Sequence, residues 1–428
     1  MNEHFVREPV IDITRLANGL TVATERMPEI PTATLGVWVG AGSRNEEPQE
    51  HGLSHLIEHM AFKGTATRSA RRIAEDIENV GGDINAATSV EYTSYTARVL
   101  GEDIDVALDV IGDILTNSVF DETELAREKG VILQEYAAVE DTPDDLIYDA
   151  FMETAFADQA IGRPILGRPE TVGSFDADAI RAFMAREYAP NRMVLAAAGD
   201  VDHRQIVEAA ERFFGAMPAV EEAKTAPARY VGGERRIPRR LEQANIVLGL
   251  PGLSFKDQGY YATHLFAHVL GGGLTSRLWH EVRETRGLAY SIEAFHWPFS
   301  DCGLFGIGAG TSGTDVAELM KVTLDCALRA TEDADDVELA RAKAQAKVAL
   351  LTALETPGGR IERIARQLLS WGRVVPSDEV VARVDAVTVE DVRQAGRRVL
   401  AGAPTVAAIG PIKGLPKLAR IASELRES

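Results

Sequence analysis

The sequence predicts an α+β fold made of two homologous sheet-and-helix halves. Strand-like and helix-like segments follow one another without strict alternation, which is typical of a sheet backed by helices. The stretch from Glu124 to Pro143 recurs as Glu338 to Pro357, with Glu-Leu-Ala-Arg-x-Lys at its start and Thr-Pro at its end in both copies. The chain of 428 residues also exceeds the size of one ordinary core, so two or more domains are expected.

The first half shows the elements of such a fold in order. Residues 12–25 read as a hairpin that turns on Asn18-Gly19, a signal for a type I′ turn. Residues 32–39 form a β-branched run, and 89–100 alternate in part between apolar and polar side chains, so both predict strands. Apolar residues at helical spacing predict helices at 53–62, 69–80, 103–117, 122–139 and 175–187.

Further parts of the first half recur in the second. Residues 175–181 lead to the apolar run 194–199, as 387–393 lead to 406–410, and 34–39 correspond to 245–250. The stretch 217–233 is rich in Ala, Glu, Pro and Gly, which is typical of a linker. We therefore expect an N-terminal half at 1–218, a linker at 219–233 and a C-terminal half at 234–428.

Composition places the chain among soluble globular proteins. No run of about 18 apolar residues exists, so no membrane span is expected. The N-terminal residues include acids and lack an apolar core, which argues against a secretory signal or a transit peptide. Two cysteines in so long a chain indicate no disulfide scaffold, and they suit a cytoplasmic location. The net charge of −20 serves solubility and argues against nucleic acid as a partner.

A possible zinc site lies in the first half, in the pentad His55-x-x-Glu58-His59. On a helix the two histidines share one face and could hold one zinc ion. Glu58 lies beside the same face and could take a proton from a water that the metal activates, as in zinc peptidases. A pentad with three fixed positions also arises by chance. His51, one turn before His55, is either a rival ligand or a structural residue.

A third ligand could come from the predicted helix at 122–139. Glu128 and Glu135 lie seven residues apart and therefore share one face of that helix. A catalytic zinc site needs such a third protein ligand and one open position. A glutamate-rich helix can equally be a solvated surface helix, so the spacing alone leaves both readings open.

Together these residues resemble the insulinase-type, or pitrilysin-type, zinc metallopeptidases, in particular the branch of the mitochondrial processing peptidase and its bacterial relatives. That family has His-x-x-Glu-His and a glutamate 76 residues after the second histidine, where this chain has Glu135. It also has a glutamate seven residues earlier, where this chain has Glu128. The segments 42–46, 62–65 and 81–86 are similar to family patterns as well, and the likeness covers residues 10–410.

The resemblance implies a zinc endopeptidase that acts on extended or unfolded peptides. It implies that His55, His59 and Glu135 bind one Zn2+ ion per chain, that Glu58 is the general base, and that Glu128 orients a ligand histidine. Its fold is expected to be two halves that close like a clamshell around a chamber.

The second half lacks the carboxylates of the first but keeps other family residues. Glu58 corresponds to Ala267, between His264 and His268, and Glu128 and Glu135 correspond to Ala342 and Ala349, so the His264/His268 pair is expected to be structural. The resemblance implies that an arginine and a tyrosine seven residues later, here Arg283 and Tyr290, hold the substrate and donate to the oxyanion. The alternative is that Arg283 is a surface helix residue and that Tyr290 packs at a strand start. Gly271–Gly273 lack the rest of a phosphate-loop motif and predict a tight turn at a helix end.

Asn85 and Ala86 match family positions that pair the substrate backbone with an edge strand. The family usually has an aromatic residue where this chain has Ala87, which puts side-chain preference there in doubt. The alternative to an active peptidase is a non-catalytic partner or structural subunit, because some relatives have lost the metal ligands or the base. In bacterial members of this family that are split into two different subunits, one chain has the zinc motif and the other the Arg/Tyr pair. This chain has both, so the resemblance favours a homodimer or a self-sufficient enzyme over a heterodimer.

Overall fold

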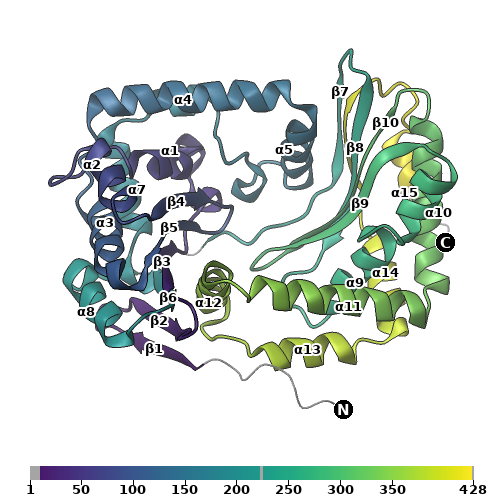
Figure 1. The fold of residues 1–428 in the computed structure, drawn as a ribbon. Helices are drawn as coiled ribbons and strands as arrows, with labels where there is room; N and C mark the ends of the chain where they lie inside the picture. The colour runs from purple at the N-terminus through teal and green to yellow at the C-terminus, as the bar shows by residue number, and fades with distance from the viewer. Residues whose placement is uncertain (1–9, 222–224, 427–428) are drawn as a thin grey trace. The chain divides into compact units, whose positions relative to one another are not determined.

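The computed structural model describes residues 10–221 and 225–426. Contacts divide the chain into two compact units. Unit 1 comprises the chain up to Ala137, Arg163–Thr225 and Leu350–Asp378, and unit 2 comprises Ala138–Gly162, Ala226–Ala349 and the chain from Glu379 onward. Each unit contains one sheet with helices packed on it (Figure 1), so the predicted α+β fold with two sheet-and-helix halves is confirmed.

Unit 1 is built on a six-stranded sheet in the order β1-β2-β6-β3-β5-β4. Strands β2 and β6 run parallel, and the other neighbours run antiparallel. Strand β4 is the last strand at one edge. The strands are β1 (Ile11–Arg15), β2 (Thr21–Arg26), β3 (Thr32–Val39), β4 (Asp83–Thr88), β5 (Thr93–Leu100) and β6 (Met193–Gly199).

Most helices of unit 1 pack on one face of this sheet. Alternate strand residues such as Leu35 and Val37 point into their shared core, whereas Trp38 points to the other face. Helix α4 contributes Leu125 and Ile132 to the core. The helices are α1 (Leu53–Met60), α2 (Ala70–Glu78), α3 (Ile104–Thr116), α4 (Glu122–Asp141), α6 (Pro169–Ser174), α7 (Ala177–Glu187) and α8 (His203–Phe214).

Unit 2 repeats this arrangement with a five-stranded sheet in the order β7-β11-β8-β10-β9. Strands β7 and β11 are parallel, and the others are antiparallel. The strands are β7 (Gly233–Pro238), β8 (Gln243–Gly252), β9 (Ala289–Pro298), β10 (Gly303–Ser312) and β11 (Thr405–Gly410). The helices of the second repeat include α9 (Tyr260–Gly271), the π-helix η6 (Trp279–Thr285), α10 (Val316–Asp333), α11 (Asp336–Ala353), α13 (Ser377–Ala386), α14 (Val389–Leu400) and α15 (Leu418–Arg426). Helix α9 ends at Gly271, as the glycine run predicts.

The first repeat is the N-terminal half of the chain, and the second repeat is the C-terminal half. The second face of each sheet is covered by a helix from the other repeat. In unit 1, α12 (Pro357–Trp371) packs against β6, β3 and β2, and its Ile361 joins an apolar cluster with Trp38. In unit 2, α5 (Pro143–Ala155) packs against β11, β8 and β7. Its Phe151 ring lies directly over Gly249, where an added Cβ atom would come within 2.0 Å of the ring. Helices α5 and α12 both begin at the repeated Thr-Pro, so the two repeats exchange one equivalent helix.

Some predicted details are wrong. The strand predicted at 89–100 begins at Thr93, because residues 89–92 form the turn between β4 and β5. The hairpin of β1 and β2 is confirmed, but its turn is not type I′, which needs a positive φ at both Asn18 and Gly19. Gly19 has φ 95°, whereas the described non-glycine residues with positive φ are Phe120 and Asp158. Leu16 and Leu20 close a longer loop through a backbone hydrogen bond of 2.8 Å, so only its glycine adopts the left-handed conformation.

Some predictions fall on residues outside the described part of the chain. The N-terminal residues 1–9, which bear on the absence of a signal or transit peptide, lie outside it, as do 222–224 of the expected linker. The division into 1–218, 219–233 and 234–428 stays a prediction, and the contacts group 138–162 and 350–378 differently. Among the helices that the structure describes, none combines the length and apolar character that a membrane crossing needs.

Candidate metal centre

Helix α1 carries the predicted histidines, and the chain before it fixes where the helix begins. Gly52 has φ 96°, a left-handed value that favours glycine, and an added Cβ atom would lie 2.7 Å from the Cα atom of Gly167. The carboxylate of Glu46 accepts the backbone N–H groups of Gly52 (2.9 Å) and Ser54 (2.7 Å). Burial raises the pKa of Glu46 to about 7, although these hydrogen bonds act in the opposite direction. Glu46 therefore caps the first turn of α1.

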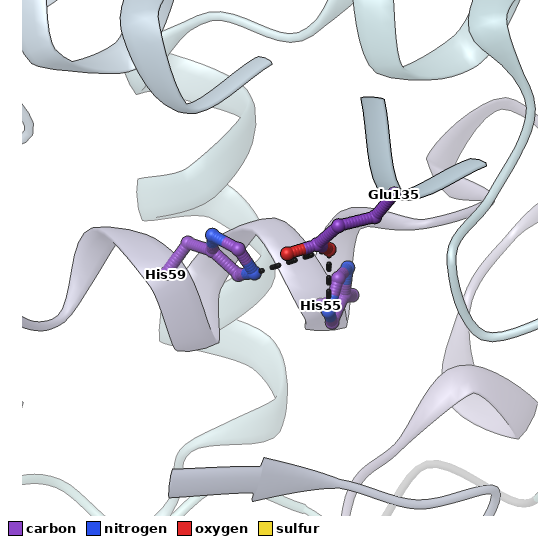
Figure 2. A group of neighbouring side chains, drawn as sticks. All are labelled: His55, His59 and Glu135. Atoms are coloured by element: carbon purple, nitrogen blue, oxygen red, sulfur yellow. Dashed lines mark ion pairs between the residues drawn. The ribbon is translucent and has the colours of Figure 1, made fainter. Parts of the chain in front are cut away.

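Two imidazoles of α1 face one carboxylate of α4. The ring centroids of His55 and His59 lie 4.6 Å apart with an interplanar angle of 71°. The Oε2 atom of Glu135 lies 3.8 Å from Nε2 of His55 and 3.7 Å from Nε2 of His59. Figure 2 shows the three side chains directed toward one another. Over 10–221 and 225–426, this is the one group of at least three His, Cys, Asp or Glu residues whose ligand atoms all lie within 4.8 Å of one another.

The donor set fits a tetrahedral zinc ion. Ligand atoms that lie about 2.0–2.2 Å from such an ion are about 3.4 Å from each other. The Nε2–Oε2 separations of 3.7 and 3.8 Å are close to this value and too long for hydrogen bonds. Burial, together with the neighbouring His59, lowers the pKa of His55 to about 4, so His55 is neutral at neutral pH. Neutral imidazole is the form that binds a metal ion.

Glu128 contacts His59 on the side of the ring opposite to Glu135. Its Oε2 atom lies 3.0 Å from Nδ1 of His59, and its Oε1 atom lies 2.7 Å from Nζ of Lys63. Burial alone would raise the pKa of Glu128, but the hydrogen bonds from Lys63 and His59 outweigh burial and lower it. A charged Glu128 accepts the Nδ1–H of His59, which leaves the lone pair on Nε2 toward Glu135.

Glu58 lies on α1 between the two histidines and is half-buried. Near it, the hydroxyl groups of Tyr95 and Tyr188 lie 2.8 Å apart in the core. Burial raises the pKa of both tyrosines, and the negative charge of Glu58 adds to the effect. Both hydroxyl groups therefore stay protonated at neutral pH. No sequence pattern points to this pair, because Tyr95 lies on strand β5 and Tyr188 follows the distant helix α7.

His51 is not part of the group. Its Nε2 atom lies 2.7 Å from the carbonyl oxygen of Pro164, and its own carbonyl accepts the hydroxyl group of Thr171 at 2.6 Å. The hypothesis of a rival ligand is therefore wrong, and His51 ties the start of α1 to the chain at 164–171.

Asn85 and Ala86 lie on β4, the edge strand, and β4 packs against α1. The N–H group of Ser89 donates to the carbonyl oxygen of Tyr92 at 2.8 Å where β4 turns into β5. In the register of the two strands, Asn85 opposite Thr96 then forms a hydrogen-bonded pair, and Ala86 opposite Tyr95 a non-hydrogen-bonded one. The N–H and C=O groups of Ala86 therefore point to the open edge of the sheet.

Arg283 and Tyr290 lie together in unit 2. The guanidinium carbon of Arg283 is 4.8 Å from the ring centroid of Tyr290 and 4.1 Å from that of Trp279. Arg283 belongs to the π-helix η6, a type of turn often found at functional sites. Tyr290 is 77% exposed, which does not support the alternative that it packs at a strand start. The sequence does not point to Trp279, because an aromatic residue on a helix is usually taken as part of a buried core.

The second repeat keeps histidines without the carboxylates. His264 and His268 lie on α9 with ring centroids 4.9 Å apart. Burial, with contributions from His268 and His296, lowers the pKa of His264 to about 4. Helix α11 carries Ala342 and Ala349 where α4 carries Glu128 and Glu135.

Comparison with known proteins gives the family. The model of insulinase (peptidase family M16) matches residues 21–169, and the model of the peptidase M16 inactive domain matches residues 174–346. An uncharacterized zinc protease of Streptomyces coelicolor is 41% identical, over 94% of this chain and 89% of that protein. One of Bacillus subtilis is 35% identical, over 93% of this chain and 98% of that protein.

Solved structures show the same fold. A protease from Helicobacter pylori superposes with a TM-score of 0.86 at 20% identity, covering 95% of this chain and all (100%) of that chain. A chain of complex III2 from Candida albicans gives a TM-score of 0.85 at 24% identity, covering 97% of this chain and 99% of that chain. On the strength of the two family models and the close bacterial relatives, this chain belongs to the insulinase family of zinc proteases, peptidase family M16.

Proposed function

We propose that this protein is a zinc-dependent endopeptidase that hydrolyses extended or unfolded peptides. The observation that carries the proposal is the convergence of His55, His59 and Glu135, with their ligand atoms within 4.8 Å of one another, beside the half-buried Glu58. The names of the relatives, which are zinc proteases, support the same chemistry. One ion per chain is proposed, because one such donor group occurs in the described residues.

Each residue of unit 1 has a defined task in this proposal. A bound zinc ion would supply Lewis acidity that activates water and polarises the scissile carbonyl. Glu58 takes one proton from the attacking water and delivers it to the amine that leaves when the C–N bond breaks. Glu128 keeps His59 in the orientation and tautomer that present Nε2 to the metal.

The substrate is proposed to bind as an added strand. Ala86 offers its N–H and C=O at the open edge of β4, next to the helix that carries the histidines. Backbone pairing of this kind selects extended chains and is indifferent to most side chains. The exposed Asn85 is proposed to contact the same peptide through its side chain.

Arg283 and Tyr290 are proposed to act on the substrate rather than on the metal. The Tyr290 hydroxyl would donate a hydrogen bond to the developing oxyanion, and Arg283, held between two aromatic rings, would help to bind the peptide. Arg283→Ala and Tyr290→Phe should therefore lower peptide turnover and leave the zinc content unchanged.

The test of the proposed function compares variants by zinc content and by cleavage of an unstructured peptide. Glu58→Gln should keep about one zinc per chain and lose activity, whereas Glu135→Gln should lose zinc and activity together. Glu122→Gln, on the exposed first turn of the same helix, is the matched control and should behave as the unsubstituted protein. Full activity in the Glu58→Gln variant would refute the proposal.

A non-catalytic partner or structural subunit is the alternative function, and the presence of all three ligands and the base argues against it. A homodimer in the cytoplasm is also proposed. Light scattering on the purified protein and fractionation of the host cell test these two points. A monomer that retained full activity would refute the dimer.

A further inference from the structure

We propose that Lys63 is a positioning residue for the metal ligand His59 and acts through Glu128. This inference rests on the proposed zinc site. The Lys63 ammonium group, Glu128 and His59 form a chain of two contacts, 2.7 Å from Nζ to Oε1 and 3.0 Å from Oε2 to Nδ1. Each oxygen of the Glu128 carboxylate thus has one partner. The Oε1 atom contacts the Lys63 ammonium group, and the Oε2 atom contacts the His59 imidazole.

The position of Lys63 makes its role more than that of a surface charge. It lies just after α1, and its backbone N–H donates to the carbonyl of Met60 at 3.1 Å, which fixes where the side chain starts. Its partner Glu128 is only 8% exposed, and Lys63 itself is 30% exposed. Exposed ion pairs contribute little to stability, but a buried carboxylate that loses its cation is left poorly solvated.

Without Lys63, the Oε1 atom of Glu128 would lose the contact that fixes it, and the carboxylate could rotate toward water. Such a rotation weakens the acceptor that holds the Nδ1–H of His59. The imidazole could then adopt the other tautomer, in which Nε2 carries the proton and cannot bind a metal.

The second histidine cannot compensate. The Nδ1 atom of His55 is buried and has no hydrogen-bond partner among the described residues. The Glu128 carboxylate therefore fixes the ring orientation and the tautomer of His59, whereas no described carboxylate does so through Nδ1 of His55. The affinity for zinc should depend on the Lys63–Glu128–His59 chain more than on any contact of His55 outside the metal.

A competing effect has the opposite sign. A lysine charge near a zinc ion repels the metal, so removing the charge could tighten binding. Glu128 lies between Lys63 and His59 and offsets this charge, so the loss of orientation should dominate. Changes of residues that hold a metal ligand in place typically cost 10–100-fold in metal affinity, and we expect about 10-fold for Lys63→Met.

The experiment measures the zinc dissociation constant of the full chain by competition with a chromogenic chelator. Lys63→Met should raise the dissociation constant about 10-fold, and Lys63→Arg, which keeps a cation and its donors, should restore most of the affinity. Lys129→Met is the matched control. Lys129 is the neighbour of Glu128 on α4, but its Nζ donates to the carbonyl of Gly173 at 3.2 Å, so the same loss of charge should leave zinc affinity unchanged.

A double-mutant cycle shows whether Lys63 acts through Glu128. Glu128→Gln alone should weaken zinc binding, and adding Lys63→Met to it should cause little further loss. The visible absorption of the cobalt-substituted protein gives a second readout, since a displaced His59 alters the tetrahedral spectrum. Circular dichroism identifies a variant that does not fold, in which case Lys63→Gln takes its place.

The outcomes separate the two proposals. If the unsubstituted protein binds no zinc at the site, the proposed function fails. If it binds zinc and Lys63→Met binds equally well while Glu128→Gln binds more weakly, the proposed role of Lys63 is wrong. Equal weakening by Lys63→Met and Lys129→Met would likewise overturn it, because the loss of affinity would then not depend on the contact with Glu128.

Discussion

The exchange of α5 and α12 can be tested with one pair of equivalent isoleucines. Ile361 on α12 is 1% exposed, and Ile147, at the same repeat position on α5, is 3% exposed. Truncation of Ile361 to alanine removes three carbon atoms, worth about 2.4 kcal/mol in transfer free energy at about 0.8 kcal/mol each. A cavity term adds to this, so we expect a loss of about 3 kcal/mol, within the usual range of about 2–5 kcal/mol.

Hydrogen exchange followed by mass spectrometry reports where that stability is lost. A loss of about 3 kcal/mol corresponds to roughly 100-fold faster exchange of amides that exchange through opening of the unit. In Ile361→Ala the faster amides should lie in β2, β3 and β6 of unit 1, although Ile361 belongs to the second repeat. In Ile147→Ala they should lie in β8 and β11 of unit 2.

Two results would refute this reasoning. Faster exchange of β8 and β11 in Ile361→Ala would mean that α12 stabilises the sheet of its own repeat. Acceleration of less than about 5-fold in both variants would mean that these isoleucines contribute far less than their burial implies.

Three further predictions follow from other parts of the structure. A fragment of residues 1–218 lacks α12, which leaves Trp38 and Val194 uncovered; it should aggregate alone and become soluble when 234–428 is co-expressed, as gel filtration would show. Arg360→Met removes the ion-pair partner of Glu25, whose side chain is 2% exposed, and should lower the free energy of unfolding of unit 1 by about 3–5 kcal/mol, measured with denaturant. The double variant Glu25→Gln/Arg360→Met should recover part of that free energy, and an unchanged unfolding midpoint for Arg360→Met would contradict the pairing. Burial lowers the pKa of His296 to about 4, so between about pH 6.5 and 4 the unfolded chain binds a proton at His296 and the folded chain does not. The free energy of unfolding should therefore fall as pH drops through this range, and His296→Gln should reduce the slope of unfolding free energy against pH by about 1.4 kcal/mol per pH unit, the value for one proton.

Local sequence patterns predicted the structural features that depend on residues close together in the chain. The face shared by His55 and His59 follows from a spacing of four residues on a helix, and the strand at 32–39 was predicted with the bounds that β3 has. Glu135 was different. Its distance along the chain gave no geometric reason for it to meet His55, and only the family resemblance pointed to it.

The features that the sequence does not predict depend on packing between residues that are far apart in the chain. An amphipathic helix such as α12 shows that it has an apolar partner, but the pattern does not say which sheet that partner is. The capping of α1 by Glu46 and the contact of Lys63 with Glu128 need the folded chain before either can be seen. The turn at Asn18 failed for a related reason, because the loop length was set by the paired strands and not by the dipeptide.

The exchanged helices give the second repeat a reason to persist in evolution. The second repeat has Ala342 and Ala349 on α11 where the first has Glu128 and Glu135 on α4, so it lacks the carboxylates of the candidate metal centre. Deleting the second repeat would also delete α12 and uncover one face of the sheet of unit 1, the unit that contains His55, His59 and Glu135. The fold of the repeat that holds His55, His59 and Glu135 therefore depends on the other repeat, and loss of either gene segment would leave one sheet face of the remaining repeat uncovered.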